Sequence, residues 1–266
     1  MTDAQTHASS DVDLSRFVDL SGRVAIVTGA SSGFGARFCR VLAAAGASVV
    51  AAARREERLA ALAAEVPAVV PVRCDVADDD ACRALVATTL ERFGRVDVLV
   101  NNAGASDAPE RVESEDLDHY RAVMEVNINA CFVLASLVGP TMIDQRSGSV
   151  INIGSVHGQV GSSPNNQAAY VISKHAVVGL TRELSLQWAR HNVRVNCIGP
   201  GYFETELTAP MFEAEDQGLG WITRNTPMRR AGIEGELDGV LLFLASDAST
   251  YCTGQVICVD GGWTAR

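Results

Sequence analysis

The stretch "VAIVTGASSGFGAR", residues 24–37, decides the fold that this chain is expected to adopt. An apolar run of strand length leads into a glycine-rich turn, and the turn leads into a helix start. The free N–H groups and positive dipole of a helix start attract a phosphate, and glycines let the backbone approach it closely. Gly29, Gly33 and Gly35 are spaced G-x-x-x-G-x-G, and no lysine makes the turn a P-loop. The stretch therefore predicts a dinucleotide site at the first strand–helix junction, with a plain tight turn as the alternative.

Strand-like runs alternate with helical stretches from this unit to the end of the chain. Strands are expected at 23–29, 48–53, 69–75, 96–104, 149–155, 193–201 and 255–262. Helices are expected at 33–45, 55–65, 78–93, 114–145, 168–190 and 234–246, whereas 202–233 is long and irregular and is read as a substrate loop. Apolar strands alternating with helices predict an α/β fold: a single-domain, Rossmann-like, doubly wound parallel sheet with helices on both faces.

Composition limits the class of protein. The 266 residues are 47% hydrophobic, enough for one full core, and the formal net charge is −10. The acidic balance disfavours nucleic acid and anionic membrane as partners, because both need a basic surface. No apolar run of about eighteen residues suggests a membrane span. The polar residues 1–13, read as a flexible tail before a domain over 14–266, do not resemble a secretory signal, so a cytoplasmic protein is expected.

The cysteines and histidines show no pattern of a disulfide framework or a metal site. Seven cysteines are an odd number without C-x-x-C, and most lie in apolar runs, as reduced core thiols do. The five histidines lack a spacing such as H-E-x-x-H. No metal is expected.

The stretch "AAYVISKHAVVGL", residues 168–180, places Tyr170 one helical turn ahead of Lys174. A free phenol ionises near pH ~10, and a nearby ammonium favours the phenolate. From these residues alone, the pair is either a tuned acid/base or two side chains that share a helix face.

Six motifs in order resemble the short-chain dehydrogenases/reductases. They are TGASSGFG (28–35), NNAG (101–104), Asn127 in VNINA, INIGSVHG (151–158), YxxxK (170–174) and PGYFET (200–205). The resemblance covers the chain from about residue 20 to the C-terminus. It implies an NAD(P)-dependent oxidoreductase that moves a hydride between nicotinamide and a secondary alcohol or ketone.

The resemblance also implies four catalytic roles. Tyr170 would exchange a proton with the substrate oxygen, and Lys174 would favour its phenolate and hold the nicotinamide ribose. Ser155 would hydrogen-bond the substrate oxygen, and Asn127 would hold a water of the proton relay.

The chain departs from the family pattern around the serine. The family often has two serines where this chain has Gly154 and Ser155, and the interval to Tyr170 is longer than usual. Ser162 and Ser163 are therefore rivals of Ser155. His157 lies nearby, where packing or substrate lining is favoured over chemistry.

The cofactor contacts implied by the resemblance follow the strand ends, with turn chemistry and strand packing as the alternative reading of these residues. Gly29, Ser31, Ser32, Gly33, Phe34 and Gly35 would enclose the pyrophosphate; Asp75 and Val76 would flank the adenine; Asn102, Ala103 and Gly104 would line the cofactor; Pro200, Gly201, Phe203 and Thr205 would lie over its nicotinamide end.

The second strand indicates which nicotinamide is used. An NAD site usually ends this strand with an acid, and an NADP site offers an arginine to the 2′-phosphate. Ala53 stands where the acid would be, and Arg54 and Arg55 follow. NADP is therefore the expected cofactor, with Arg54 as the main phosphate contact. NAD stays open, because the glycine turn carries no basic residue.

Three other functions are alternatives to this oxidoreductase. An epimerase or dehydratase would show T-G-x-x-G-x-x-G and a larger C-terminal domain, and a non-catalytic dinucleotide-binding protein would have lost catalytic positions. A 3-oxoacyl-thioester reductase of fatty-acid type shares every motif, although 202–216 holds five acids and no Lys or Arg to dock an acidic carrier. The expected partner is a small-molecule alcohol or ketone. The resemblance also implies a homotetramer, in which the helices at 114–145 and 168–190 pair between subunits.

Overall fold

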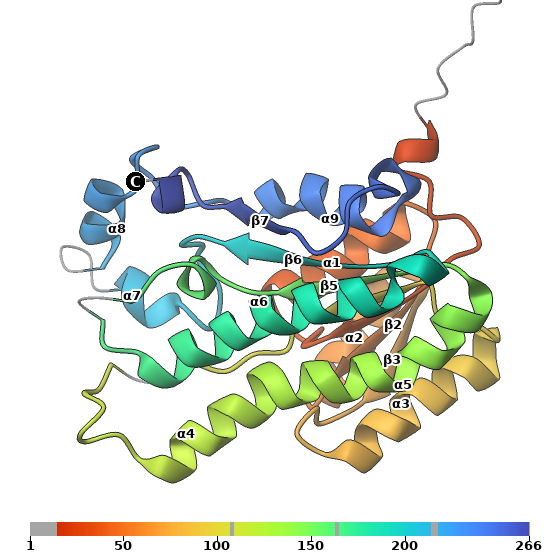
Figure 1. Ribbon diagram of the computed structural model, residues 1–266, viewed down its shortest axis with the longest axis horizontal. Coiled ribbons are helices and arrows are strands. Elements are labelled where there is room, and N and C mark those ends of the chain that lie inside the picture. The colour runs from red at the N-terminus through yellow and green to blue at the C-terminus, as the bar shows by residue number, and fades with distance from the viewer. Residues whose placement is uncertain (1–14, 107–108, 163–164, 214–217, 266) are drawn as a thin grey trace, which may run out of the picture.

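The chain folds around a parallel sheet of seven strands in the part that the computed structural model describes, residues 15–106, 109–162, 165–213 and 218–265. The strand order is β3-β2-β1-β4-β5-β6-β7 (Figure 1). The strands are β1 Val24–Thr28, β2 Ser48–Ala53, β3 Val69–Arg73, β4 Val98–Asn101, β5 Gly148–Ile153, β6 Val193–Pro200 and β7 Val256–Val259. The order reverses between β1 and β4, where doubly wound sheets bind ligands beyond the strand carboxyl ends. The predicted α/β fold class is confirmed; the predicted tail, 1–13, lies outside the described residues.

The helices lie on both faces of this sheet. They are α1 Gly33–Ala44, α2 Glu56–Glu65, α3 Asp79–Phe93, α4 Leu117–Met124, α5 Ala130–Gln145, α6 Ala168–Trp188, α7 Ala209–Glu213, α8 Leu219–Asn225 and α9 Asp238–Ala245. In Figure 1, α3, α5 and α6 lie on the near side of the sheet, while α1 and α9 lie behind it. The arrows of β6 and β7 point toward the end where α7 and α8 lie.

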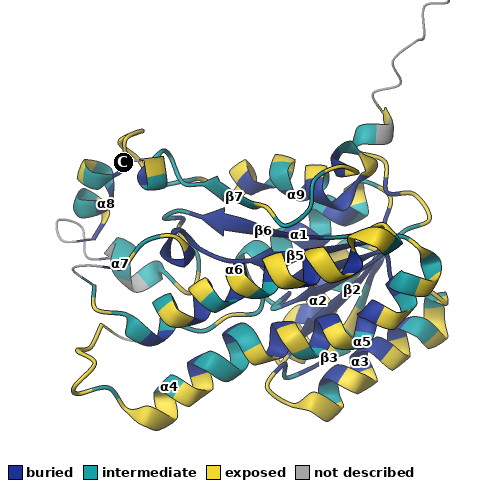
Figure 2. Cartoon of the chain, in the orientation of Figure 1, coloured by how far each residue is buried: buried dark blue, intermediate teal, exposed yellow. Residues whose placement is uncertain are grey.

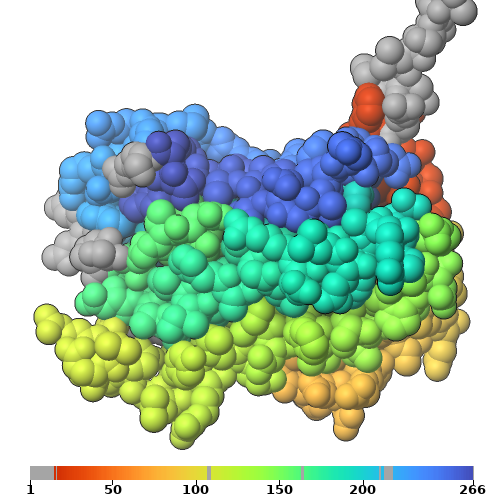
Figure 3. Space-filling view, viewed as in Figure 1, coloured from red at the N-terminus to blue at the C-terminus, as the bar shows by residue number. Residues whose placement is uncertain are grey.

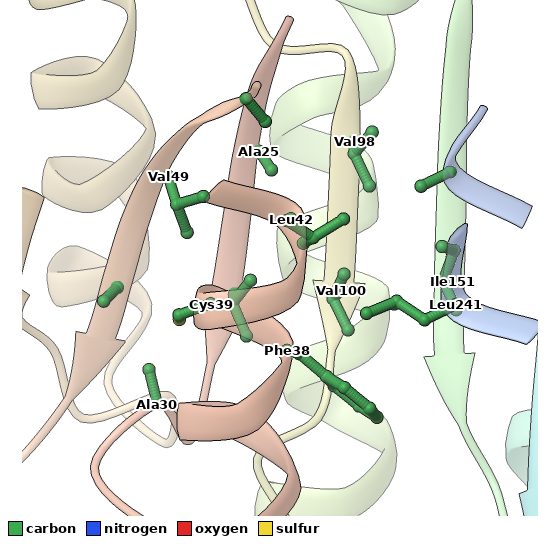
Figure 4. Packing of buried hydrophobic residues seen from close by; sticks show 14 of the residues in the cluster. Ala25, Ala30, Phe38, Cys39, Leu42, Val49, Val98, Val100, Ile151 and Leu241 are labelled. Carbon is green, nitrogen blue, oxygen red and sulfur yellow. The ribbon is translucent and has the colours of Figure 1, made fainter. Parts of the chain in front are cut away.

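The two large apolar clusters lie on opposite sides of the sheet because successive strand residues point to opposite faces. Ala25 and Val27 of β1 join Phe38 of α1 and Leu241 of α9 in one cluster (Figure 4). Ile26, between them, belongs to the other cluster, with side chains of α3, α5 and α6. Figure 2 shows the result: the central strands are buried, and the helices are exposed along their outer sides. Burial on both faces explains why the strands read as continuous apolar runs.

The helix expected at 114–145 begins at Leu117 and is not uniform. A π-helical turn, Glu125–Asn129, separates α4 from α5. A single π turn widens a helix by one residue without ending it and is frequent at functional sites. The periodicity of the sequence therefore predicted the helix but not its interruption.

The helix Leu117–Gln145 is also long and apolar enough, by length and composition, to cross a membrane. Its apolar residues have another use: Leu134, Val138 and Met142 are completely or almost completely buried in the cluster under α3, α5 and α6. A core helix of an α/β protein meets the same criterion.

All seven cysteines are free thiols, as the sequence predicted. Five are buried, and the other two, Cys252 and Cys258, are half-buried. Burial raises the pKa of Cys39 and of Cys197 to about 12, because the thiolate loses its hydration in an apolar surrounding. In the described residues, no group of His, Cys, Asp and Glu is arranged to hold a metal ion.

Candidate active site

The glycine turn after β1 is shaped so that only glycine fits two of its positions. Gly29 has φ +65°, which side chains rarely adopt. A Cβ on Gly35 would stand 2.6 Å from Asn102 Nδ2 and closer still to the carbonyl oxygen of Gly29. The turn is therefore packed against the end of β4 with no room for a methyl group.

The N-terminus of α1 is left open for an anion. Its N-cap residue, Ser32, makes no side-chain hydrogen bond to the helix, and the first turn holds no acidic residue. The Ser32 hydroxyl instead accepts a hydrogen bond from Arg55 Nη2 at 2.8 Å. The free N–H groups and the dipole of α1 suit a phosphate, as the sequence predicted.

The ends of β1 and β4 are joined by side chains that flank the turn. Thr28 Oγ1 accepts hydrogen bonds from the backbone N–H groups of Asn102 and Ala103, both at 3.0 Å. Asn102 Nδ2 donates to the Thr28 carbonyl at 2.8 Å. These bonds fix residues 102–104 at the end of β4, where the resemblance places the cofactor.

Tyr170 and Lys174 lie together on the first turns of α6. Lys174 Nζ stands 5.4 Å from the centre of the Tyr170 ring and donates to the Ile153 carbonyl at 2.9 Å. Lys174 is only 5% exposed, whereas Tyr170 is half-buried. A buried ammonium with one anchored N–H keeps two further N–H donors for the pocket.

The π turn holds Asn127 beside this pair. Its Oδ1 accepts from Ala105 N at 2.7 Å, and its Nδ2 donates to the Ala105 carbonyl and to Ser173 Oγ, both at 2.9 Å. Ser173 Oγ in turn donates to the Tyr170 carbonyl at 2.7 Å. Asn127 thus ties the chain after β4 to the helix that carries Tyr170.

Ser155 follows β5 and is buried. Its Oγ accepts from His157 N at 3.1 Å, which leaves its O–H as a donor. Of its rivals, Ser162 accepts from Gln167 N at 3.0 Å, beside the start of α6, and Ser163 lies outside the described residues. A Cβ at residue 154 would stand 2.6 Å from Cys197 Sγ, which explains why glycine replaces the usual serine there.

The adenosine side of the site is rich in arginine. Arg54 is 76% exposed in its side chain, with Nη1 4.0 Å from Asp75 Oδ2. Arg55, which the sequence left without a role, donates to the hydroxyls of Ser31 and Ser32 and forms an ion pair of 2.7 Å with Glu206. The hydrogen bonds from Arg55 lower the pKa of Glu206 to about 2. The Arg55–Glu206 pair ties the glycine turn to the substrate loop.

The segment after β6 covers the other side of the turn. A Cβ on Gly201 would stand 2.7 Å from Asp260 Cα, so Gly201 with Pro200 packs directly on the chain after β7. Phe203 is buried, with its ring centre 5.3 Å from that of Phe34. Thr205 Cβ stands 3.6 Å from the place of a Cβ on Gly33. The side chains of Phe34 and Phe203 therefore pack the loop onto the turn. Val76, which follows β3 and is expected beside the adenine, is also buried.

The segment 202–233 is less irregular than predicted, since it holds α7 and α8. Their five and seven residues are too few for a clear helical period in the sequence. The rings of Tyr202 and Trp221 contact that of Trp263 near the C-terminus. The sequence predicted no role for Trp263, because a single tryptophan after "DGG" does not show which residues it will contact. Figure 3 shows α8 and the C-terminal segment gathered at one end of the molecule.

The residues present fit a dinucleotide. A helix start without a side-chain cap, a turn that excludes side chains and a row of fixed strand ends lie at the carboxyl edge where the sheet order reverses. Tyr170 and Lys174 lie at the same edge, beyond β5. The arrangement suits proton exchange next to a bound nicotinamide.

Comparisons with known proteins agree with this geometry. The family model described as enoyl-(acyl carrier protein) reductase matches residues 29–264. The galactitol 2-dehydrogenase of Cereibacter sphaeroides is 39% identical over 92% of this chain and 96% of its own. The 3-oxoacyl-[acyl-carrier-protein] reductase of Thermotoga maritima is 40% identical, over 91% and 98%.

A solved structure extends the likeness to three dimensions. The gluconate 5-dehydrogenase of Burkholderia cenocepacia, in complex with NADP and tartrate, superposes with a TM-score of 0.90 at 37% identity. The match covers 95% of this chain and 98% of that one. With its fold, its ordered motifs and these relatives, the chain belongs to the short-chain dehydrogenase/reductase family and is an NAD(P)-dependent oxidoreductase that acts on CH–OH groups.

Proposed function

We propose that the protein interconverts a secondary alcohol and a ketone of a free small molecule, with Tyr170 as the general acid/base. The observation that carries this proposal is the group of Tyr170, Lys174 and Asn127 at the carboxyl edge of the sheet. In oxidation, the hydroxyl gives its proton to Tyr170 while Ser155 donates a hydrogen bond to the same oxygen. The buried Lys174 ammonium lies 5.4 Å from the centre of the ring of Tyr170, which receives the proton. A nicotinamide held at its ribose by Lys174 would supply the chemistry of hydride transfer.

A free substrate is preferred over a carrier-bound thioester. The 3-oxoacyl-thioester reductase stays the alternative because one relative and the family description carry that activity. Against it, the exposed Glu204 places negative charge on the loop beside the site, where an acidic carrier would be repelled, whereas the charge of Glu206 is paired with Arg55. The test follows cofactor absorbance with a panel of polyols, sugars, their corresponding ketones and the thioester acetoacetyl-CoA. Faster reduction of the thioester than of every ketone in the panel would reject the small-molecule assignment.

We predict that NADP is preferred and that Arg54 reads its 2′-phosphate. The Arg54 side chain is largely exposed and only loosely paired, so it can turn to a phosphate, while Arg55 is already engaged. A guanidinium binds a phosphate bidentately. Arg54→Ala is expected to lower the ratio of kcat/KM for NADPH over NADH by about 10- to 100-fold, the value of a charged hydrogen bond.

Arg55→Ala is the matched control for Arg54. It removes the neighbouring charge together with the bonds to Ser31, Ser32 and Glu206. A larger drop in the ratio for Arg55→Ala than for Arg54→Ala would assign the phosphate to Arg55. A wild type that favours NADH would show that the site is built for NAD.

We also propose a homotetramer in the cytoplasm. Large apolar side chains are exposed on the outer sides of α5 and α6: Phe132, Ile172 and Leu186. Such residues on long helices support a second, intermolecular interface. Free thiols are consistent with a reducing compartment. Light scattering is expected to give about four times the chain mass of 28.2 kDa, and Leu186→Glu is expected to lower it. A single-chain mass at micromolar concentration would contradict the assembly.

A further inference from the structure

A buried histidine, His157, contacts both the phenol of Tyr202 and the ring of Tyr170. His157 Nε2 lies 3.1 Å from the Tyr202 oxygen, and the His157 ring centre lies 6.3 Å from that of Tyr170. Tyr170 also acts electrostatically on Tyr202. We infer that Tyr202, oriented by His157, accepts a hydrogen bond from a second substrate hydroxyl beside the reacting carbon. This inference rests on the proposed function and narrows its substrate class to vicinal diols and α-hydroxy ketones.

The orientation of the bond between His157 and Tyr202 follows from which ring nitrogen of His157 carries the proton. His157 is 5% exposed, and burial lowers its pKa, so the ring is neutral near pH ~7 and carries one proton. The backbone acceptors of Val160 and Gly161 raise the pKa of the ring and favour a proton on Nδ1, the nitrogen that does not face Tyr202. Among the described residues, Nδ1 has no partner within hydrogen-bonding geometry. With the proton on Nδ1, Nε2 accepts the O–H of Tyr202.

Tyr202 is then left as an acceptor. Burial, and secondarily Tyr170, raises the pKa of Tyr202, so the phenol keeps its proton and shares it with His157. Its oxygen lone pairs are the part of the group that a substrate can still use. A hydroxyl satisfies them, whereas a methylene at the same place would leave a buried acceptor unpaired. Sites built to bond a substrate O–H reject analogues that lack it far more strongly than apolar pockets discriminate by size.

The surroundings of Tyr202 suit the carbon skeleton of a polyol. Its ring centre lies 5.7 Å from that of Trp221 and 4.8 Å from that of Trp263. Aromatic faces carry negative charge density, which attracts the weakly positive C–H groups of hydroxylated carbons. One acceptor within an aromatic wall matches a chain that alternates C–H and O–H groups.

The test compares alcohols that share a carbon skeleton and differ by one hydroxyl, such as cyclohexane-1,2-diol and cyclohexanol, or butane-2,3-diol and butan-2-ol. The wild type is expected to favour the diol in kcat/KM by at least about tenfold, the value of one good hydrogen bond. Tyr202→Phe is expected to bring this ratio near unity. His157→Phe is expected to lower it, and the double variant to lower it no further than Tyr202→Phe, because the two residues act as one unit. Tyr251→Phe, which changes a fully exposed tyrosine, is expected to keep the wild-type ratio.

Each outcome bears on one claim. A packing defect in the variants would slow both alcohols alike and leave the ratio unchanged, and that result would overturn the role of Tyr202. Equal use of diol and mono-alcohol by the wild type would also overturn it, while the proposed oxidoreductase would stand. If no diol, mono-alcohol or corresponding ketone turned over, the proposed function itself would fail.

Discussion

Tyr170→Phe is expected to lower kcat by about two to four powers of ten, the range of general acid–base catalysis. Phenylalanine keeps the ring beside Lys174 and His157 and removes only the group that exchanges the proton. The fold and cofactor binding are expected to survive, since no side-chain hydrogen bond of the scaffold runs through the lost hydroxyl in the described residues. Steady-state kinetics give kcat, and calorimetric titration gives the cofactor Kd.

The matched control for Tyr170→Phe is again Tyr251→Phe, the same chemical change at a fully exposed tyrosine. It is expected to leave kcat and Kd unchanged. A near-normal kcat of the Tyr170→Phe variant would contradict the assignment of Tyr170 as the general acid/base. A loss of both turnover and cofactor binding would instead show that Tyr170 acts mainly by shaping the nicotinamide site.

Gly35→Ala is expected to abolish detectable binding of the dinucleotide. The new methyl group would meet the Gly29 carbonyl oxygen and Asn102 Nδ2 at less than contact distance. Neither can retreat cheaply, because Gly29 is backbone and Asn102 is bonded to Thr28. The turn must therefore move away from β4, which displaces the helix start from the phosphate. Overpacking of this kind costs about 1–3 kcal/mol of folding free energy.

Gly239→Ala is the control for the glycine change. Gly239 is exposed in the first turn of α9, and a Cβ there would meet nothing within 4 Å. Alanine in place of a helical glycine is expected to raise the free energy of unfolding by up to about 1 kcal/mol and to leave cofactor binding intact. Denaturant unfolding and titration with the cofactor measure both quantities. A Gly35→Ala protein that binds the dinucleotide as tightly as wild type would contradict the close-packed turn.

Local patterns predicted the parts of the molecule that are local in the chain. The central strands of the sheet read as largely apolar runs because both of their faces are covered, and Gly46 and Gly94 mark the ends of α1 and α3. The π turn at Asn127 escaped prediction, since one extra residue per turn hardly disturbs a helical period. The Arg55–Glu206 pair escaped it too, because 151 residues separate the partners. The meeting of Tyr202 with His157 and Trp263 likewise depends on tertiary packing.

Because most of its thiols are buried, the rate at which this protein is alkylated reports how often it unfolds. Alkylating reagents attack the thiolate, and a thiol such as Cys39 is both shielded and almost fully protonated in the native chain. Its modification must wait for an opening that exposes the core, so the rate of labelling measures how often that opening occurs. Conversely, a cysteine introduced at an exposed position such as Glu57 would react first with a dye, because the native cysteines are buried or half-buried.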